Sequence, residues 1–187
     1  MIPYEFRAPL EADRLSLRLL TVDDVDAVHS YQSREDVCRY MLYEPRDHDT
    51  VAAKIAEWSQ RSRLEKDGDY LQLAVERHRD KRVLGEIYFT IKSATSECAE
   101  IGWSLHPDHQ GQGYAREAAS VVLTFAFNVM RLHRVVAELD PRNDASVALC
   151  RRLGMREEAH FVQDLKFKGE WADTGVYAIL AQEFAAR

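Results

Sequence analysis

The alternation of apolar and polar residues predicts a strand near the start of the chain, followed by two helices. Residues 15–19 read Leu-Ser-Leu-Arg-Leu, the pattern of a strand with one buried face. The sequence Thr-Val-Asp-Asp at 21–24 resembles a capping box and predicts a helix that reaches about Tyr31. Apolar residues then recur roughly at helical spacing over residues 49–65, which predicts a second, amphipathic helix that ends before the Asp-Gly-Asp at 67–69.

Three strand-like runs follow, with only short polar connections between them. They cover residues 71–76, 83–91 and 98–105. Connections this short join antiparallel neighbours, because a parallel crossover needs a dozen or more residues. The sequence therefore predicts an antiparallel meander in the middle of the chain.

The second half of the chain alternates helices with strands. Residues 118–130 are apolar on most sides, as in a deeply buried helix, and residues 134–139 read as a buried strand. Asn143 or Asp144 can cap another helix, which we expect to end with Gly154 just beyond its last turn.

Two final strand-like runs, residues 159–167 and 176–180, bring the predicted number of strands to about seven. The expected fold class is therefore α/β of the α+β kind, a mixed, mostly antiparallel sheet flanked by helices. The chain has 187 residues, of which 46% are hydrophobic, and it contains no linker-like stretch. We expect a single domain over residues 1–187.

Charge and composition argue against several classes of protein. The net charge is −6, and Lys and Arg are scattered among acidic residues, so we expect no nucleic-acid partner. No run of about 18 apolar residues occurs, and Glu5, Arg7 and Pro9 stand where a signal peptide would be apolar. We therefore expect a cytoplasmic protein without membrane contact. Three cysteines, an odd number without paired spacing, predict reduced thiols.

The strongest functional signal is the sequence QGQGYA at residues 110–115, between a predicted strand and a predicted helix. Two glycines ahead of a helix let the backbone approach a ligand, and the free N–H groups of a helix start attract an anion. An ordinary turn is the alternative, because Gly-x-Gly is common in loops. Arg116 in place of a third glycine disfavours a dinucleotide-binding motif, and the absence of Lys-Ser/Thr disfavours a Walker loop.

This turn is similar to the Gln/Arg-x-x-Gly-x-Gly/Ala signature of the GNAT N-acetyltransferases, and the predicted order of elements also matches that family. Residues 15–21, 99–103, 143–155 and 177–180 further resemble the branch that contains the RimJ/RimL-type ribosomal-protein acetyltransferases. The resemblance implies a GNAT-type fold and an enzyme that transfers an acetyl group from acetyl-coenzyme A to a primary amine by direct attack in a ternary complex.

The resemblance also implies how coenzyme A is held. Amides of the turn would hold the pyrophosphate, and the pantetheine arm would lie in an opening between the strands that end near Leu105 and Leu139. A backbone amide of the first strand would polarise the thioester carbonyl. The residues implied to bind coenzyme A are Trp103, Ser104, Leu105, Gln110, Gly111, Gln112, Gly113, Tyr114, Ala115 and Asn143.

A carboxylate is needed because α-amino groups and Lys side chains are mostly protonated at neutral pH. Strand alternation places Glu100 with Gly102 and Ser104 on the less apolar face of its strand. Glu100 is therefore the first candidate for the general base, and Glu86 is the second. The alternative for Glu100 is a solvated residue on an exposed sheet face.

The departing thiolate needs a proton donor. Many relatives use a Tyr in the helix after the Asn motif, and the corresponding position here is Cys150, whose apolar neighbours favour a buried thiol. Ser146 matches a Ser that the RimL-type branch places near the sulfur, so we expect Ser146 to be the acid, with Cys150 or water as alternatives. A purely structural role at the helix start would also explain Ser146.

The amine acceptor is left open by the sequence. The family builds acceptor sites from its first helices and last hairpin, here about residues 31–44 and 161–171. A protein N-terminus, a polyamine, an amino sugar or an amino acid would each fit, in a monomer or a homodimer. The second hypothesis is a catalytically inactive coenzyme-A-binding regulatory or interaction module. His106 and His109 lack a third partner, so we expect no metal.

Overall fold

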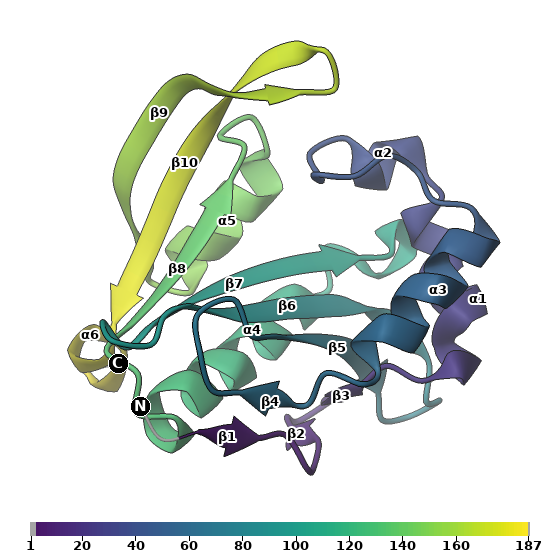
Figure 1. Ribbon diagram of the computed structural model, residues 1–187, viewed down its shortest axis with the longest axis horizontal. Coiled ribbons are helices and arrows are strands. Elements are labelled where there is room, and N and C mark those ends of the chain that lie inside the picture. The colour runs from purple at the N-terminus through teal and green to yellow at the C-terminus, as the bar shows by residue number, and fades with distance from the viewer. Residues whose placement is uncertain (1–2, 187) are drawn as a thin grey trace.

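A computed structural model describes residues 3–186. Its centre is a sheet with the strand order β2-β3-β5-β6-β7-β8-β10-β9 (Figure 1). Neighbouring strands are antiparallel except for β7 and β8, which are parallel. The strands are β2 (Leu10–Glu11), β3 (Leu15–Leu19), β5 (Tyr70–Arg77), β6 (Val83–Ser93), β7 (Cys98–Leu105), β8 (Arg134–Leu139), β9 (Arg156–Phe167) and β10 (Glu170–Leu180). The prediction of a mixed, mostly antiparallel sheet flanked by helices is confirmed.

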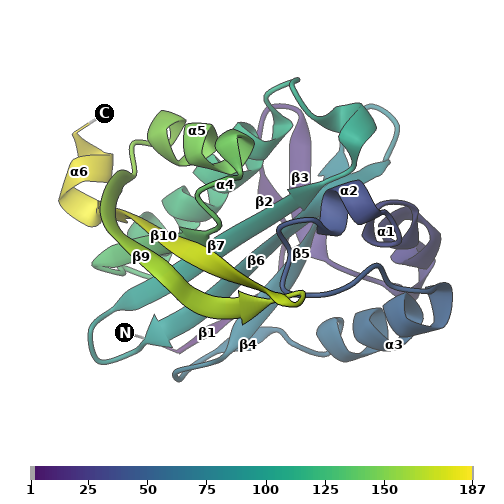
Figure 2. The same ribbon diagram turned by 90° about the horizontal axis from the view of Figure 1, so that it is seen from above.

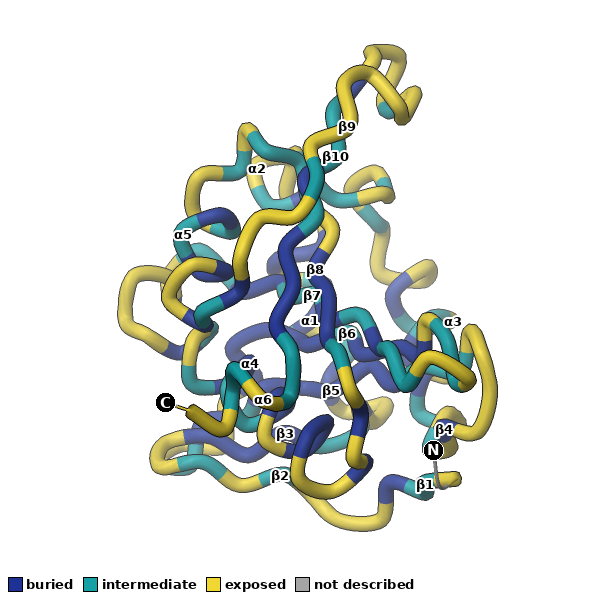
Figure 3. The backbone as a smooth tube through the Cα atoms, turned by 90° about the vertical axis from the view of Figure 1, so that its left-hand side faces the viewer, coloured by how far each residue is buried: buried dark blue, intermediate teal, exposed yellow. Residues whose placement is uncertain are grey.

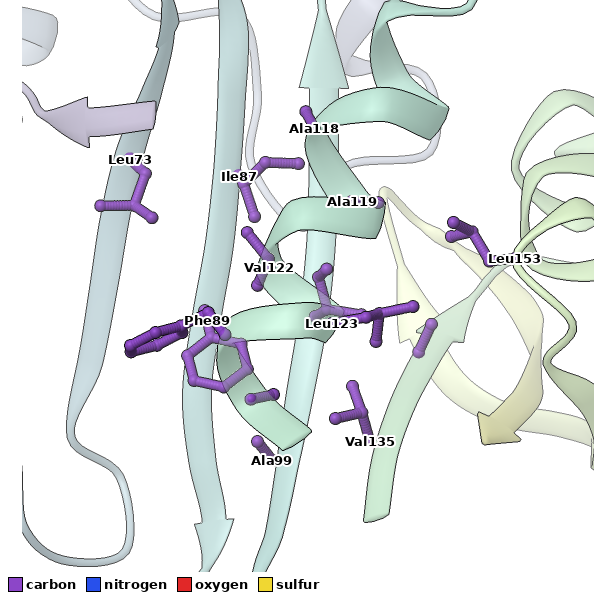
Figure 4. Packing of buried hydrophobic residues seen from close by; sticks show 14 of the residues in the cluster. Leu73, Ile87, Phe89, Ala99, Ala118, Ala119, Val122, Leu123, Val135 and Leu153 are labelled. Carbon is purple, nitrogen blue, oxygen red and sulfur yellow. The ribbon is translucent and has the colours of Figure 1, made fainter. Parts of the chain in front are cut away.

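Helices cover both faces of the sheet (Figure 2). They are α1 (Val25–Gln32), α2 (Glu35–Cys38), α3 (His48–Trp58), α4 (Tyr114–Thr124), α5 (Asp144–Arg152) and α6 (Ala181–Ala185). One face carries α4 and α5 over the main core, in which Val122 and Leu123 pack with Ile87, Phe89 and Ala99 of the sheet (Figure 4). The other face carries α1 and α3 over a smaller core. No helix within residues 3–186 is long and apolar enough to cross a membrane.

Two predicted helices have different bounds in the structure. The helix predicted over residues 49–65 ends at Trp58, because the chain turns there and Arg63–Leu64 forms β4, a short strand paired with β1 (Tyr4–Glu5). The predicted helix 118–130 starts earlier, at Tyr114, and its last part, Phe125–Val129, is a π-helical turn. Apart from β4, the strands from β3 to β8 lie close to their predicted bounds, but β9 starts at Arg156 rather than 159, and β10 starts at Glu170 rather than 176.

The β9–β10 hairpin forms the far edge of the sheet and extends beyond the rest of the molecule (Figures 1 and 3). Most of β9 is exposed. Lys168 at the hairpin turn donates a hydrogen bond of 2.6 Å from Nζ to the Cys38 carbonyl oxygen, and its Nζ lies 3.6 Å from a carboxylate oxygen of Glu44. The hairpin tip is therefore tied to the segment that follows α2.

The sheet opens between β7 and β8, which diverge in Figure 1. Their parallel pairing covers only residues 98–100 of β7 and 134–136 of β8. Beyond this point β7 remains paired with β6 as far as Leu105, and β8 remains paired with β10 as far as Leu139. Each strand is thus held by its outer neighbour while the space between the two widens. This opening is where the site is built.

Candidate active site

The turn before α4 has the backbone conformation of an anion cradle. Gly111 and Gly113 both have positive φ, +71° and +83°, and Gly113 is the N-cap of α4. Apart from Gly111 itself and its two chain neighbours, no heavy atom of the described chain lies within 4 Å of a Cβ built on Gly111, so the space beside this residue is open. Free amides at the start of an eleven-residue helix favour phosphate binding. These residues therefore fit the pyrophosphate of coenzyme A.

Arg14, immediately before β3, braces this turn from the side. Its guanidinium lies 4.5 Å from the centroid of the Tyr114 ring, and its Nε donates to Glu117 Oε2 at 2.7 Å. Its Nη1 donates to the Gln112 carbonyl oxygen at 3.2 Å. Sequence reasoning missed Arg14 because 98 residues separate it from Gln112 and no local motif links them.

Backbone groups of β7 face the opening. At the end of the β6–β7 ladder, His106 N–H donates to the Leu84 carbonyl oxygen at 2.8 Å. Because peptide groups point to alternate sides along a strand, those of Leu105 and Trp103 point away from β6, toward the side where β8 no longer pairs. The Gln110 side chain donates to the Leu105 carbonyl oxygen at 3.0 Å, which joins the cradle to the end of β7.

A cleft of about 520 Å³ lies at this opening, and no residue of the turn at 110–115 lines it. On the α1 and α3 face, its walls include Glu86, Tyr88 and Glu100, and on the α5 side they include Asn143 and Ser146. The segment after α2 closes one side; it contributes Tyr40, Met41, Leu42, Tyr43 and Arg46. The predicted acceptor segment 31–44 thus lies partly at the cleft, whereas no described residue of the hairpin segment 161–171 lines it.

Glu100 lines the cleft and forms an ion pair. Its Oε2 lies 3.2 Å from Lys92 Nζ, which also pairs with Glu138 of β8. Burial raises the pKa of Glu100, and the Lys92 charge acts in the opposite direction. Alternation is as predicted, since Ala99 and Ile101, which flank Glu100 in β7, are buried in the main core. Glu100 is therefore a cleft residue rather than one on an open solvated face.

Glu86 is the more deeply placed carboxylate. Only 3% of Glu86 is exposed, and it stands opposite Ser104 in the β6–β7 register. Gln32 of α1 donates from Nε2 to Glu86 Oε1 at 2.7 Å, while Oε2 has no hydrogen-bond partner in the described chain. Burial raises the pKa of Glu86, although the hydrogen bond from Gln32 and the positive charge of Arg46 favour its charged form.

Asn143 and Ser146 lie together at the start of α5. Asn143 caps α5 by accepting a hydrogen bond of 3.1 Å from the Ser146 N–H through Oδ1. The indole N–H of Trp103 donates to Ser146 Oγ at 3.2 Å, so the hydroxyl proton is directed elsewhere. Cys150, in contrast, is fully buried, does not line the cleft, and its pKa is raised to about 12 by burial. The geometry favours Ser146 over Cys150 as a proton donor.

No group of three His, Cys, Asp or Glu side chains within residues 3–186 is arranged to hold a metal ion. The rings of His106 and His109 have centroids 5.5 Å apart. His109 is buried, and burial lowers its pKa. Neither histidine lines the cleft.

Comparison with known proteins agrees with this architecture. The chain is 32% identical to the uncharacterized N-acetyltransferase YnaD of Bacillus subtilis over 173 residues, which cover 91% of this chain and 96% of that protein. The structure of a GNAT-family acetyltransferase from Bacillus anthracis is 30% identical, with a TM-score of 0.85 and coverage of 94% of this chain and 99% of that one. Spermidine N-acetyltransferase from Vibrio cholerae, solved with CoA and spermine, has the same fold at 22% identity, with a TM-score of 0.78 and coverage of 92% and 98%. Residues 14–156 match the model of the acetyltransferase (GNAT) domain, and the chain belongs to this family of acetyltransferases.

Proposed function

We propose that this protein transfers the acetyl group of acetyl-coenzyme A to a primary amine by direct attack in a ternary complex. The observation that carries the proposal is the cleft at the opening between β7 and β8, which brings carboxylates and aromatic rings together with Asn143 and Ser146 of α5. A donor and an acceptor can enter such a cleft from opposite faces and meet at β7. Bringing them together in this way removes much of the entropy barrier to the reaction.

The chain's own residues supply the remaining chemistry. When bound, acetyl-coenzyme A supplies an activated acetyl group, held by amides of Gly111 to Ala115, by the unpaired backbone of β7 and by Asn143. A β7 amide facing the opening would stabilise the negative charge that develops on the acetyl oxygen. The amine gives up one proton to solvent before attack and a second one after it, which Glu100 or Glu86 would accept. As the C–N bond forms and the C–S bond breaks, Ser146 would give its hydroxyl proton to the departing sulfur and regain a proton from that carboxyl group through water.

Binding of the donor is the first test. Acetyl-coenzyme A that binds only the folded state should stabilise the protein by about 2.7 kcal/mol at a concentration of 100 times Kd. A thermal melt with and without millimolar acetyl-coenzyme A measures this, with ATP as a control anion. A melting temperature that does not move would contradict the coenzyme assignment.

Turnover is the second test, and it separates an enzyme from an inactive coenzyme-A-binding module. Free coenzyme A thiol should appear when the protein is mixed with acetyl-coenzyme A and a panel of peptides with free N-termini, polyamines, amino sugars and amino acids. Peptide acceptors would support the RimJ/RimL-like assignment, and polyamines would match the spermidine acetyltransferase of similar fold. Binding without release of thiol from any member would favour the inactive module.

Ser146→Ala should lower kcat about 100-fold, the low end of the range of ~10² to 10⁴ for a positioned acid, while leaving the Kd of coenzyme A unchanged. Steady-state kinetics and calorimetry measure the two quantities. Cys150→Ala serves as the control, since that thiol is buried away from the cleft. If kcat of Ser146→Ala matches that of the native protein, water rather than Ser146 protonates the thiolate.

A further inference from the structure

One amide in the cleft joins a carboxylate to a guanidinium. Gln32 donates from Nε2 to Glu86 Oε1 at 2.7 Å, and its Oε1 accepts a hydrogen bond of 2.8 Å from Arg46 Nη1. Glu86 and Arg46 both line the cleft. Since the same amide bonds to both groups, the distance between them is at most the length of the amide plus these two hydrogen bonds.

We propose that Glu86 and Arg46 form the acceptor subsite for an amino acid, with its ammonium at Glu86 and its carboxylate at Arg46. This inference rests on the proposed acetyl transfer and gives it an acceptor class. An amino acid carries its ammonium and its carboxylate on the same carbon. The short distance between its two charges therefore matches two protein groups that are joined by a single amide.

Glu86 has an open position for an ammonium. Its Oε2 is buried without a partner in the described chain, and the Tyr43 hydroxyl, in the same cleft, is also buried without one. A buried carboxylate oxygen that lacks a donor is costly, so a bound cation that donates to it would be favoured. Glu86 also stands opposite Ser104, beside the β7 backbone that faces the opening. An amine at Glu86 is therefore close to the expected acetyl group.

Arg46 presents a fixed plane to the cleft. Its guanidinium carbon lies 3.8 Å from the centroid of the Tyr43 ring and 5.5 Å from that of Trp58. Arg46 pairs with no carboxylate among the residues that the structure describes, and Gln32 takes only one of its donor nitrogens. A stacked guanidinium with free donors suits a carboxylate in two-point contact.

The other charged groups of the cleft already have partners. Glu100 and Glu138 share Lys92, and Lys54 pairs with Glu57 at 3.1 Å. What remains is one open carboxylate oxygen and one guanidinium, which match a zwitterion. A polyamine would bring several positive charges against Arg46, and a peptide N-terminus would leave Arg46 without a carboxylate. The rings of Tyr40, Tyr70 and Tyr88 line the same cleft and favour an apolar side chain.

Matched substrates test the two halves of the subsite. We would measure kcat/KM for L-leucine against 3-methylbutylamine, and for L-phenylalanine against 2-phenylethylamine and phenylalaninamide, with spermidine in the same assay. Each amine lacks only the carboxylate of its amino acid. Phenylalaninamide keeps the shape of phenylalanine without the carboxylate charge. The amino acids should exceed their uncharged partners by about 10- to 100-fold, the effect of a hydrogen bond to a charged group. Equal rates within pairs, or spermidine as the best acceptor, would overturn the proposal.

Substitutions test which residues cause the preference for amino acids over amines. Arg46→Gln should lower kcat/KM of the amino acids to the level of the amines and leave the amines within about twofold. Glu86→Gln should weaken both kinds of acceptor, because both lose the ammonium contact. Lys54→Gln, which removes an already paired cation, should keep the preference. A loss that Arg46→Gln causes equally for amines and amino acids would refute its role, provided that melting temperatures show folded protein.

Calorimetric binding of the amino acids to the protein saturated with coenzyme A gives a readout that does not need turnover. Amino-acid binding that Arg46→Gln abolishes, without acetylation of any acceptor, would contradict the proposed transfer and leave the subsite intact. Acetylation of spermidine but not of amino acids would support the proposed transfer and contradict the amino-acid subsite. If no amino acid binds and no acceptor is acetylated, both proposals fail.

Discussion

A protein with alanine at both Gly111 and Gly113 should bind acetyl-coenzyme A about 30- to 700-fold more weakly than the native chain. Both glycines have φ in the left-handed region, +71° and +83°. A residue with a Cβ costs roughly 1–2 kcal/mol in that region, so two such residues cost about 2–4 kcal/mol, and 1.4 kcal/mol is tenfold in affinity. The substituted turn can relieve this strain only by leaving the conformation in which its amides converge.

Gly68→Ala is the matched control for this experiment. Gly68 has the same φ as Gly113, +83°, and a Cβ built on it meets no heavy atom of the described chain within 4 Å. It hydrogen-bonds the Ile91 carbonyl oxygen, at the end of β6 opposite to the cradle. The backbone cost should therefore appear in its melting temperature but not in coenzyme A binding, which titration calorimetry measures. If the double variant bound acetyl-coenzyme A as tightly as the control, the turn would not be the cradle.

Those parts of the site that depend on short-range chemistry were predictable from the sequence. The turn at residues 110–115, the Asn143 cap with Ser146 three residues later, and the face occupied by Glu100 all follow from spacing within one element. The roles proposed for these residues rest on this local placement. Spacing alone does not predict where a helix ends, because α3 ends at Trp58 rather than at residue 65.

The acceptor side could not be predicted in the same way, because its contacts join elements that are far apart in the chain. Glu86 meets Gln32 across 54 residues, and Lys92 reaches Glu138 across 46. Each contact depends on which helix packs on which strand and on the register of the strands. A shift of one residue in that register would turn the side chains to the other face of the sheet. Alternation along β7 predicts the face that Glu100 occupies, but it does not predict the ion pair between Glu100 and Lys92.

Arg18→Met should lower the free energy of unfolding by about 3 kcal/mol at pH 7. Arg18 in β3 donates to both carboxylate oxygens of Asp24, at 2.7 and 2.8 Å, and to Glu76 of β5 at 2.7 Å. Removing one partner of a buried pair costs roughly 3–5 kcal/mol. The low end applies because the Arg18 side chain is 24% exposed, whereas Asp24 is 6% exposed.

The same ion group predicts how this loss changes with pH. Burial is the largest single influence and would raise the pKa values of Asp24 and Glu76, but Arg18 together with Thr21 at Asp24 and with Lys81 at Glu76 outweighs it, and both pKa values are lowered. Their stabilising contribution is therefore complete above the unfolded values of about 3.9 and 4.3, and it is lost as pH falls through the lower folded values. Urea titrations at pH 7 and pH 3 should show the difference between native protein and Arg18→Met shrinking at pH 3. Arg7→Met, which removes an ion pair between exposed side chains, should change little at either pH. A difference that stays constant between the two pH values would mean that Arg18 stabilises the fold by packing rather than through its carboxylate partners.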